Sequence, residues 1–206
     1  MIKREQYMCR IRPFIGNDLI KVLTGIRRSG KSVMLDLIKE ELISSGISDA
    51  QFITFNFEAM KNAHLCTAEA LYREIIQQTA EINGKVYLFF DEIQEVVNWE
   101  RCINSFRVEL DCDIYITGSN AKLLSGELAT YLAGRYIEFI IYPFSFGEFR
   151  ELYTSVFPAA NPAQASANIL LLAACLPCQS SLCPGAMPPI SGSALRFCCF
   201  KGYREA

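Results

Sequence analysis

The first 154 residues alternate between short apolar runs and longer amphipathic stretches. Short apolar or β-branched runs are typical of buried strands, and apolar residues three or four positions apart are typical of helices. The pattern predicts strands at 19–24, 51–57, 86–90, 114–117 and 136–142, and helices at 32–45, 67–83, 99–110 and 146–153. Strands that alternate with helices favour crossover connections. We therefore predict an α/β fold, with a mainly parallel sheet covered by helices on both faces.

The composition changes abruptly near Thr154. Residues 155–206 contain only four charged residues, but they contain six of the eight prolines and five of the nine cysteines. Prolines interrupt helices, and this segment shows no helical or strand period. We predict one ordered domain over residues 1–154, followed by an irregular proline- and cysteine-rich tail over residues 155–206.

Charge, hydropathy and cysteine usage exclude several classes of protein. The net charge of -2 gives no strongly basic surface for nucleic acid. No stretch reaches the roughly 18 apolar residues of a membrane helix, and no secretory signal is visible, so we expect a cytoplasmic protein without a membrane partner. An odd number of cysteines argues against a disulfide framework. Zinc bound through Cys175 and Cys178 is a weaker alternative, because no second half-site has matching spacing.

The segment Gly25–Ser32 fits the phosphate-binding pattern G-x-x-x-x-G-K-[ST], between a predicted strand and a predicted helix. Its two glycines permit a tight turn whose N–H groups face phosphate oxygens, and the helix N-terminus favours negative charge. Lys31 is expected to reach the β- and γ-phosphates, and the Ser32 hydroxyl to bind Mg²⁺. The residues expected to bind the nucleotide are Gly25, Ile26, Arg27, Arg28, Ser29, Gly30, Lys31, Ser32 and Val33.

An acidic pair, Asp91 and Glu92, directly follows the apolar run at 86–90. Ligands of open α/β folds bind at the carboxyl ends of the strands, where this pair is predicted to lie. We expect Asp91 to hold Mg²⁺, and Glu92 to act as the general base or to orient water. The alternative is a solvated pair that begins a helix and interacts with its dipole.

Three further residues are candidates for the catalytic site. Ser119 and Asn120 follow the fourth predicted strand, and either side chain could orient the attacking water. The alternative for both is a helix N-cap. Arg135 precedes the last predicted strand, and an arginine beside the γ-phosphate would stabilise charge in the transition state. The alternative for Arg135 is an ordinary surface ion pair.

These motifs together resemble the prokaryotic AAA+-type P-loop ATPases that carry a C-terminal domain of unknown function. The resemblance rests on GIRRSGKS, LFFDEIQEV, ITGSNAKLL and LAGRYIEFIIYPFSFGEF, and it covers about residues 1–154. It implies a P-loop NTPase fold with strand order 5-1-4-3-2, and ATP with Mg²⁺ as the ligands. By matching motifs, it places Ser119 or Asn120 in the sensor role and Arg135 beside the phosphates.

The resemblance stops near Tyr153, since such proteins continue through a lid and a C-terminal domain. Our hypothesis is that residues 155–206 are a frameshifted or truncated remnant. The sequence favours an ATP hydrolase that acts on an unidentified protein or DNA partner. Two alternatives are an ATP-binding switch or hydrolysis-deficient fragment, and a small-molecule kinase. The oligomeric state is not predicted by these residues.

Overall fold

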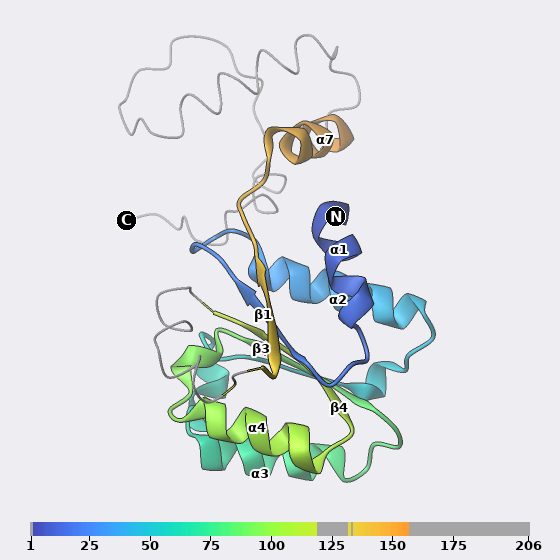
Figure 1. Ribbon diagram of the computed structural model, residues 1–206. Coiled ribbons are helices and arrows are strands. Elements are labelled where there is room, and N and C mark those ends of the chain that lie inside the picture. The colour runs from blue at the N-terminus through green and yellow to red at the C-terminus, as the bar shows by residue number, and fades with distance from the viewer. Residues whose placement is uncertain (1, 119–131, 133, 157–206) are drawn as a thin grey trace, which may run out of the picture. The chain divides into compact units, whose positions relative to one another are not determined.

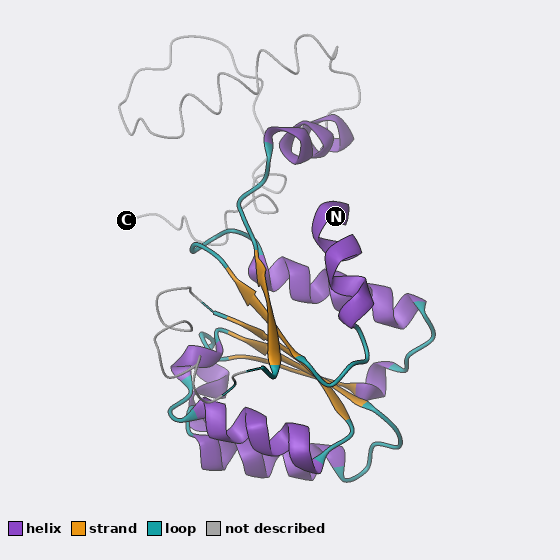
Figure 2. Cartoon of the chain, viewed as in Figure 1, coloured by secondary structure: helices purple, strands orange, loops and turns teal. Residues whose placement is uncertain are grey.

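Five parallel strands lie side by side in the order β2-β3-β4-β1-β5 (Figures 1 and 2). The strands are β1 (Ile20–Thr24), β2 (Phe52–Asn56), β3 (Val86–Asp91), β4 (Cys112–Thr117) and β5 (Tyr136–Ile140). Read from the other edge, this is the predicted order 5-1-4-3-2. The predicted α/β class and parallel sheet are confirmed.

The computed structural model describes residues 2–118, 132 and 134–156. Residues 3–142 form one compact unit, which contains the whole sheet. The second unit contributes the helix α7 (Phe146–Val156), which was predicted over 146–153. The Ser145 hydroxyl accepts from the Glu148 N–H at 3.3 Å, and the Glu148 carboxylate accepts from the Ser145 N–H at 2.7 Å. This reciprocal pair caps the start of α7. The irregular tail was predicted from residue 155, but residues 155 and 156 belong to α7, and the rest of the tail lies outside the described residues.

Helices cover both faces of the sheet. α1 (Glu5–Ile11) and α2 (Lys31–Ser44) lie on one face, and α3 (Ala68–Thr79) and α4 (Trp99–Glu109) lie on the other (Figure 1). The apolar pattern predicted α2, α3 and α4, although α3 ends earlier than expected. It missed α1, a helix of seven residues with three buried side chains. Single-turn 3₁₀ helices lie at Arg12–Phe14, Asp49–Gln51 and Ile93–Glu95, and a longer one at Met60–Leu65.

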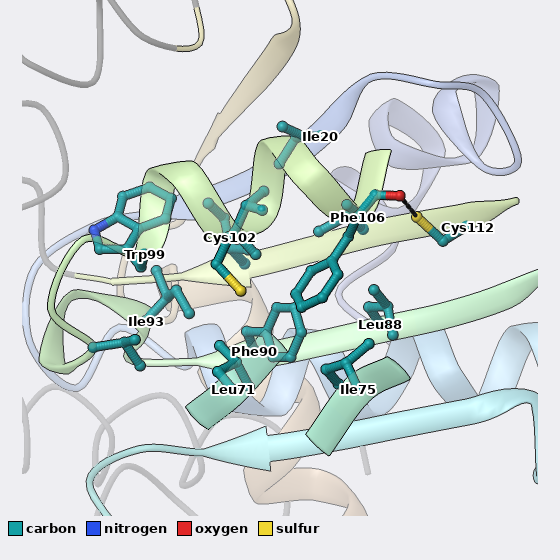
Figure 3. Packing of buried hydrophobic residues seen from close by; sticks show 14 of the residues in the cluster. Ile20, Leu71, Ile75, Leu88, Phe90, Ile93, Trp99, Cys102, Phe106 and Cys112 are labelled. Carbon is teal, nitrogen blue, oxygen red and sulfur yellow. Dashed lines mark hydrogen bonds between the residues drawn. The ribbon is translucent and has the colours of Figure 1, made fainter. Parts of the chain in front are cut away.

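Every residue of β3 is buried, because successive side chains enter two different cores. Leu88 and Phe90 face α3 and α4, where they join Leu71, Ile75 and other apolar side chains (Figure 3). Tyr87 and Phe89 face α1 and α2. This arrangement explains why the strand reads as a continuous apolar run rather than an alternating one.

Because the strands are parallel, their carboxyl ends meet at one edge of the sheet. Thr24, Asn56, Asp91 and Thr117 are the last residues of β1, β2, β3 and β4. This edge is where ligands of open α/β sheets bind. None of the described helices is both long and apolar enough to span a membrane.

Candidate nucleotide site

The segment predicted to bind phosphate, Gly25–Ser32, is called the phosphate loop below. As predicted, it lies between a strand and a helix: β1 ends at Thr24 and α2 begins at Lys31. Both glycines are required by its geometry. Gly25 has φ +146°, and a Cβ there would lie 2.2 Å from the Ile141 carbonyl oxygen. Gly30 precedes α2 in the left-handed region, with φ 92°. A residue with a Cβ would be strained at both positions, so glycine is needed for the backbone to form this tight loop.

Lys31 is buried under this loop, and 4% of its side chain is exposed. Its Nζ donates to the carbonyl oxygens of Ile26 at 3.3 Å and Gly25 at 3.5 Å. The same Nζ lies 3.9 Å from Oε1 of Glu92, so the structure brings together two predicted catalytic residues that are far apart in sequence. A lysine held among loop carbonyls and one carboxylate lies where it can transfer its contacts to phosphate oxygens.

Asp91 and Ser32 provide oxygen donors beside the loop. Asp91 is buried at the end of β3, and burial raises the pKa of its carboxyl group. Hydrogen bonds from Thr117 and Ser32 act in the opposite direction and lower this pKa. A carboxylate and a hydroxyl next to a phosphate site are the donor set that Mg²⁺ uses in nucleotide-binding proteins. The residues present therefore fit the ion.

Glu92 has a left-handed backbone, with φ 56° and ψ 48°. This conformation is costly for a residue with a Cβ and is concentrated at functional sites. Its N–H donates to Thr117 Oγ1 at 3.0 Å, and its Oε2 accepts from Gln94 Nε2 at 2.6 Å. The side chain is 23% exposed. Glu92 is thus held near Lys31 while part of its carboxylate stays open to water.

The sequence pattern missed three residues that contact the predicted site. Thr117 donates from Oγ1 to Asp91 Oδ1 at 2.5 Å, and Asn56 donates from Nδ2 to Asp91 Oδ2 at 2.8 Å. Each is the polar last residue of a strand, which is the signal that could have found them. Arg4 donates from Nη1 to the carbonyl oxygen of Ser29, within the loop. Only the fold brings Arg4 to this place.

The remaining loop residues differ in exposure. Ser29 is buried, and Val33 is partly buried against the core that contains α2. Ile26 is exposed, and Arg27 forms an exposed ion pair with Glu58 at 3.1 Å. Arg28 is exposed and has φ 66°. Contact of these five residues with a nucleotide stays a prediction.

The expected position of Arg135 beside the phosphates is wrong for this chain. The carbonyl oxygen of Arg135 accepts from the N–H of Ile20 at 3.0 Å, at the amino end of β1. The phosphate loop follows the carboxyl end of the same strand, roughly 13 Å away at 3.3 Å per residue. Nη1 of Arg135 donates to Asn104 Oδ1 on α4 at 3.1 Å. Ser119 and Asn120 lie outside the described residues.

A family model described as "AAA domain" matches residues 17–150 of the chain. The chain belongs to this family. The AAA domain fold is also shown by solved structures. One is the Aeropyrum pernix ORC1 protein in complex with DNA, with a TM-score of 0.56 and 14% identity over 84% of this chain and 56% of that chain. At this identity the likeness concerns the fold alone. Nucleotide binding is the function suggested for this AAA domain.

Two curated relatives are more similar in sequence. A protein of Haemophilus influenzae is 44% identical over 149 residues, which is 72% of this chain and 37% of the relative. A protein of Methanocaldococcus jannaschii is 38% identical over 130 residues, which is 63% of this chain and 28% of the relative. Both are described as uncharacterized. The chain therefore spans about a third of the length of these relatives.

Proposed function

We propose that this AAA domain binds ATP together with Mg²⁺ and hydrolyses the bond between the β- and γ-phosphates, which releases ADP and phosphate. The observation that carries the proposal is the meeting of Lys31 and Glu92 at 3.9 Å, beside the glycine-bounded loop. A cation at a phosphate cradle and a partly exposed carboxylate next to it are two of the groups that ATP hydrolysis requires of the protein.

Each residue has a distinct part in the proposed reaction. The loop backbone and Lys31 bind the β- and γ-phosphates and neutralise their charge. Ser32 and Asp91 would hold Mg²⁺, which supplies charge neutralisation between the phosphates when it is bound. Glu92 accepts a proton from the attacking water at its carboxylate. Thr117 fixes the positions of the Asp91 carboxylate and the Glu92 backbone relative to each other, because its hydroxyl contacts both.

The water-orienting role of Ser119 or Asn120 remains part of the proposal. No part is assigned to Arg135, because it lies at the opposite edge of the sheet. The activity would be coupled to an unidentified protein or DNA partner. A chain that binds ATP as a switch, without turnover, is the alternative to hydrolysis.

ATP affinity and phosphate release test the proposal in reducing buffer, with and without Mg²⁺. Lys31→Ala is expected to weaken ATP binding at least tenfold, whereas Lys61→Ala, at an exposed lysine, leaves it unchanged. Glu92→Gln is expected to lower turnover about 100-fold or more while ATP still binds. Glu81→Gln, at an exposed glutamate away from the loop, is its matched control.

The outcomes separate the alternatives. Binding that is lost in Lys31→Ala, with no phosphate release by the wild type, would support the ATP-binding switch. Phosphate release that survives Glu92→Gln unchanged would remove Glu92 from the role of base. A folded wild type that binds no ATP would reject the proposed function.

A further inference from the structure

Arg4 is a buried cation that contacts the phosphate loop from the N-terminal segment. The residue is 2% exposed, and its backbone is left-handed, with φ 45° and ψ 49°, where it precedes α1. Nη1 donates to the carbonyl oxygen of Ser29 at 2.9 Å, and Nη2 donates to the carbonyl oxygen of Tyr142 at 2.6 Å. One guanidinium group therefore joins the loop to the segment that follows β5.

Tyr7, on the first turns of α1, fixes this guanidinium group from a second side. The Tyr7 ring centroid lies 4.6 Å from Cζ of Arg4, in a cation–π contact. The Tyr7 hydroxyl accepts from the N–H of Tyr142 at 3.1 Å. Both backbone groups of Tyr142 are thus held by residues of the N-terminal segment. The guanidinium plane cannot rotate freely, so its two donors keep fixed directions.

The contact with Ser29 determines the orientation of a peptide group in the loop. The Ser29 carbonyl and the Gly30 N–H belong to the same peptide, and in a planar trans peptide they point in opposite directions. Arg4 holds the carbonyl, so the Gly30 N–H is turned away from Arg4. The guanidinium group of Arg4 also packs closely against Gly30, since a Cβ on Gly30 would lie 3.2 Å from Nη1 of Arg4.

We propose that Arg4 is a positioning residue that holds the phosphate loop in its phosphate-binding shape before nucleotide arrives. This inference rests on the proposed nucleotide site. A loop that is already ordered loses less conformational entropy on binding, and therefore binds phosphate more tightly. Lysine cannot replace arginine in this role, because a single ammonium does not bridge two carbonyl groups with a fixed planar fork.

The test compares Arg4→Lys with Arg10→Lys, a matched substitution at an exposed arginine of α1. Nucleotide affinity is measured with Mg²⁺-ATP well below the melting temperature of every variant. Arg4→Lys is expected to weaken ATP binding by roughly tenfold or more, the equivalent of one buried charge-assisted hydrogen bond, and Arg10→Lys to leave it unchanged. Hydrogen exchange of the Ser29 amide, which donates to the Ile26 carbonyl oxygen at 3.2 Å, is expected to accelerate only in Arg4→Lys.

The results distinguish this proposal from the proposed function itself. If Lys31→Ala loses ATP binding and Arg4→Lys keeps wild-type affinity, the role of Arg4 is refuted while the nucleotide site stands. A lower melting temperature with unchanged affinity would show a structural role only, and would also refute it. If wild type binds no ATP, the site itself is rejected.

Hydrogen exchange on the wild type decides the matter if Arg4→Lys does not fold. An ordered empty loop predicts slow exchange of the Ser29 amide in the nucleotide-free protein. Fast exchange there, slowed only by Mg²⁺-ATP, would overturn the proposal, because nucleotide rather than Arg4 would then order the loop.

Discussion

The hydroxyl of Thr117 donates to Oδ1 of Asp91 at 2.5 Å, across the carboxyl ends of β4 and β3. Oγ1 of Thr117 also accepts from the N–H of Glu92 at 3.0 Å. One buried hydroxyl therefore fixes the position of the proposed Mg²⁺ ligand and the backbone of the proposed base. Because a threonine hydroxyl can donate once and still accept, no other protein group is needed for this link.

We expect Thr117→Val to lower both stability and turnover. Valine has the same shape but leaves the Glu92 N–H and one Asp91 oxygen without this partner. The free energy of unfolding is expected to fall by about 1–3 kcal/mol, measured by urea titration. ATP turnover should fall at least tenfold, because Glu92 is less well placed. Thr117→Ser keeps the hydroxyl and should retain most activity. Equal losses in the two variants would contradict this role of the hydroxyl.

The left-handed backbone of Glu92 predicts a difference between Glu92→Gly and Glu92→Ala. Both variants lose the carboxylate, and both are expected to lose hydrolysis. Glycine adopts φ 56° without the steric cost that a Cβ imposes. Glu92→Gly is therefore expected to be about 1 kcal/mol more stable than Glu92→Ala in thermal or urea unfolding. A more stable alanine variant would show that the residue is not held in this conformation.

Gly25→Ala is expected to disrupt the loop through a direct clash. Its Cβ would lie 2.2 Å from the Ile141 carbonyl oxygen and 2.9 Å from Oγ of Ser29. We expect a loss of about 3 kcal/mol or more in unfolding free energy, together with loss of ATP binding. Gly46→Ala is the control, since Gly46 also has positive φ but has nothing within 4 Å of the added Cβ. That variant should lose only about 1 kcal/mol and bind ATP normally.

Lys21 and Asp113 form an ion pair at 2.6 Å with both side chains fully buried. Asp113 also accepts from the Gly16 N–H and from the Tyr115 hydroxyl. Asp113→Asn leaves the ammonium without its counter-charge, and is expected to cost about 3–5 kcal/mol at pH 7. In a double-mutant cycle, adding Lys21→Met to Asp113→Asn should recover part of this loss. No recovery would mean that the other bonds of Asp113 carry the effect.

The penalty of Asp113→Asn should also depend on pH. Burial lowers the pKa of Lys21, and the charge of Asp113 opposes this shift. Without Asp113, the folded-state pKa falls further, while the unfolded chain still binds the proton up to about pH 10.4. Because the unfolded state then holds more protons, stability rises with pH over this interval. Urea unfolding at pH 7 and pH 10 should show a smaller difference from wild type at the higher pH. A penalty that does not change with pH would contradict this account.

The local elements of the proposed nucleotide-binding edge follow from short-range patterns. The apolar run before Gly25 and the run before Asp91 each predict a buried strand, and the fold confirms both. The helix after the loop begins at Lys31, one residue before the predicted start at residue 32. These predictions succeed because strand formation, tight turns and helix starts depend on neighbouring residues.

Contacts between distant segments were decided by tertiary structure. The motifs predicted that Lys31 and Glu92 belong to one site, but they did not reveal that Thr117 contacts Asp91, because parallel strand order determines which carboxyl ends are adjacent. Arg135 shows the opposite case. Its motif suggested a phosphate contact, but the direction of β5 places it at the amino edge of the sheet.

The sequence by itself determined the P-loop class of the fold, the position of the phosphate loop and the acidic pair that follows β3. Each of these features depends on a contiguous run of residues, whose backbone conformation is determined by neighbouring residues. Only the tertiary structure decided that Arg4 is buried against the loop and that one threonine hydroxyl joins the acidic pair. The physical reason is that burial and hydrogen bonding between segments far apart in the chain depend on how the sheet is ordered, which no single segment encodes.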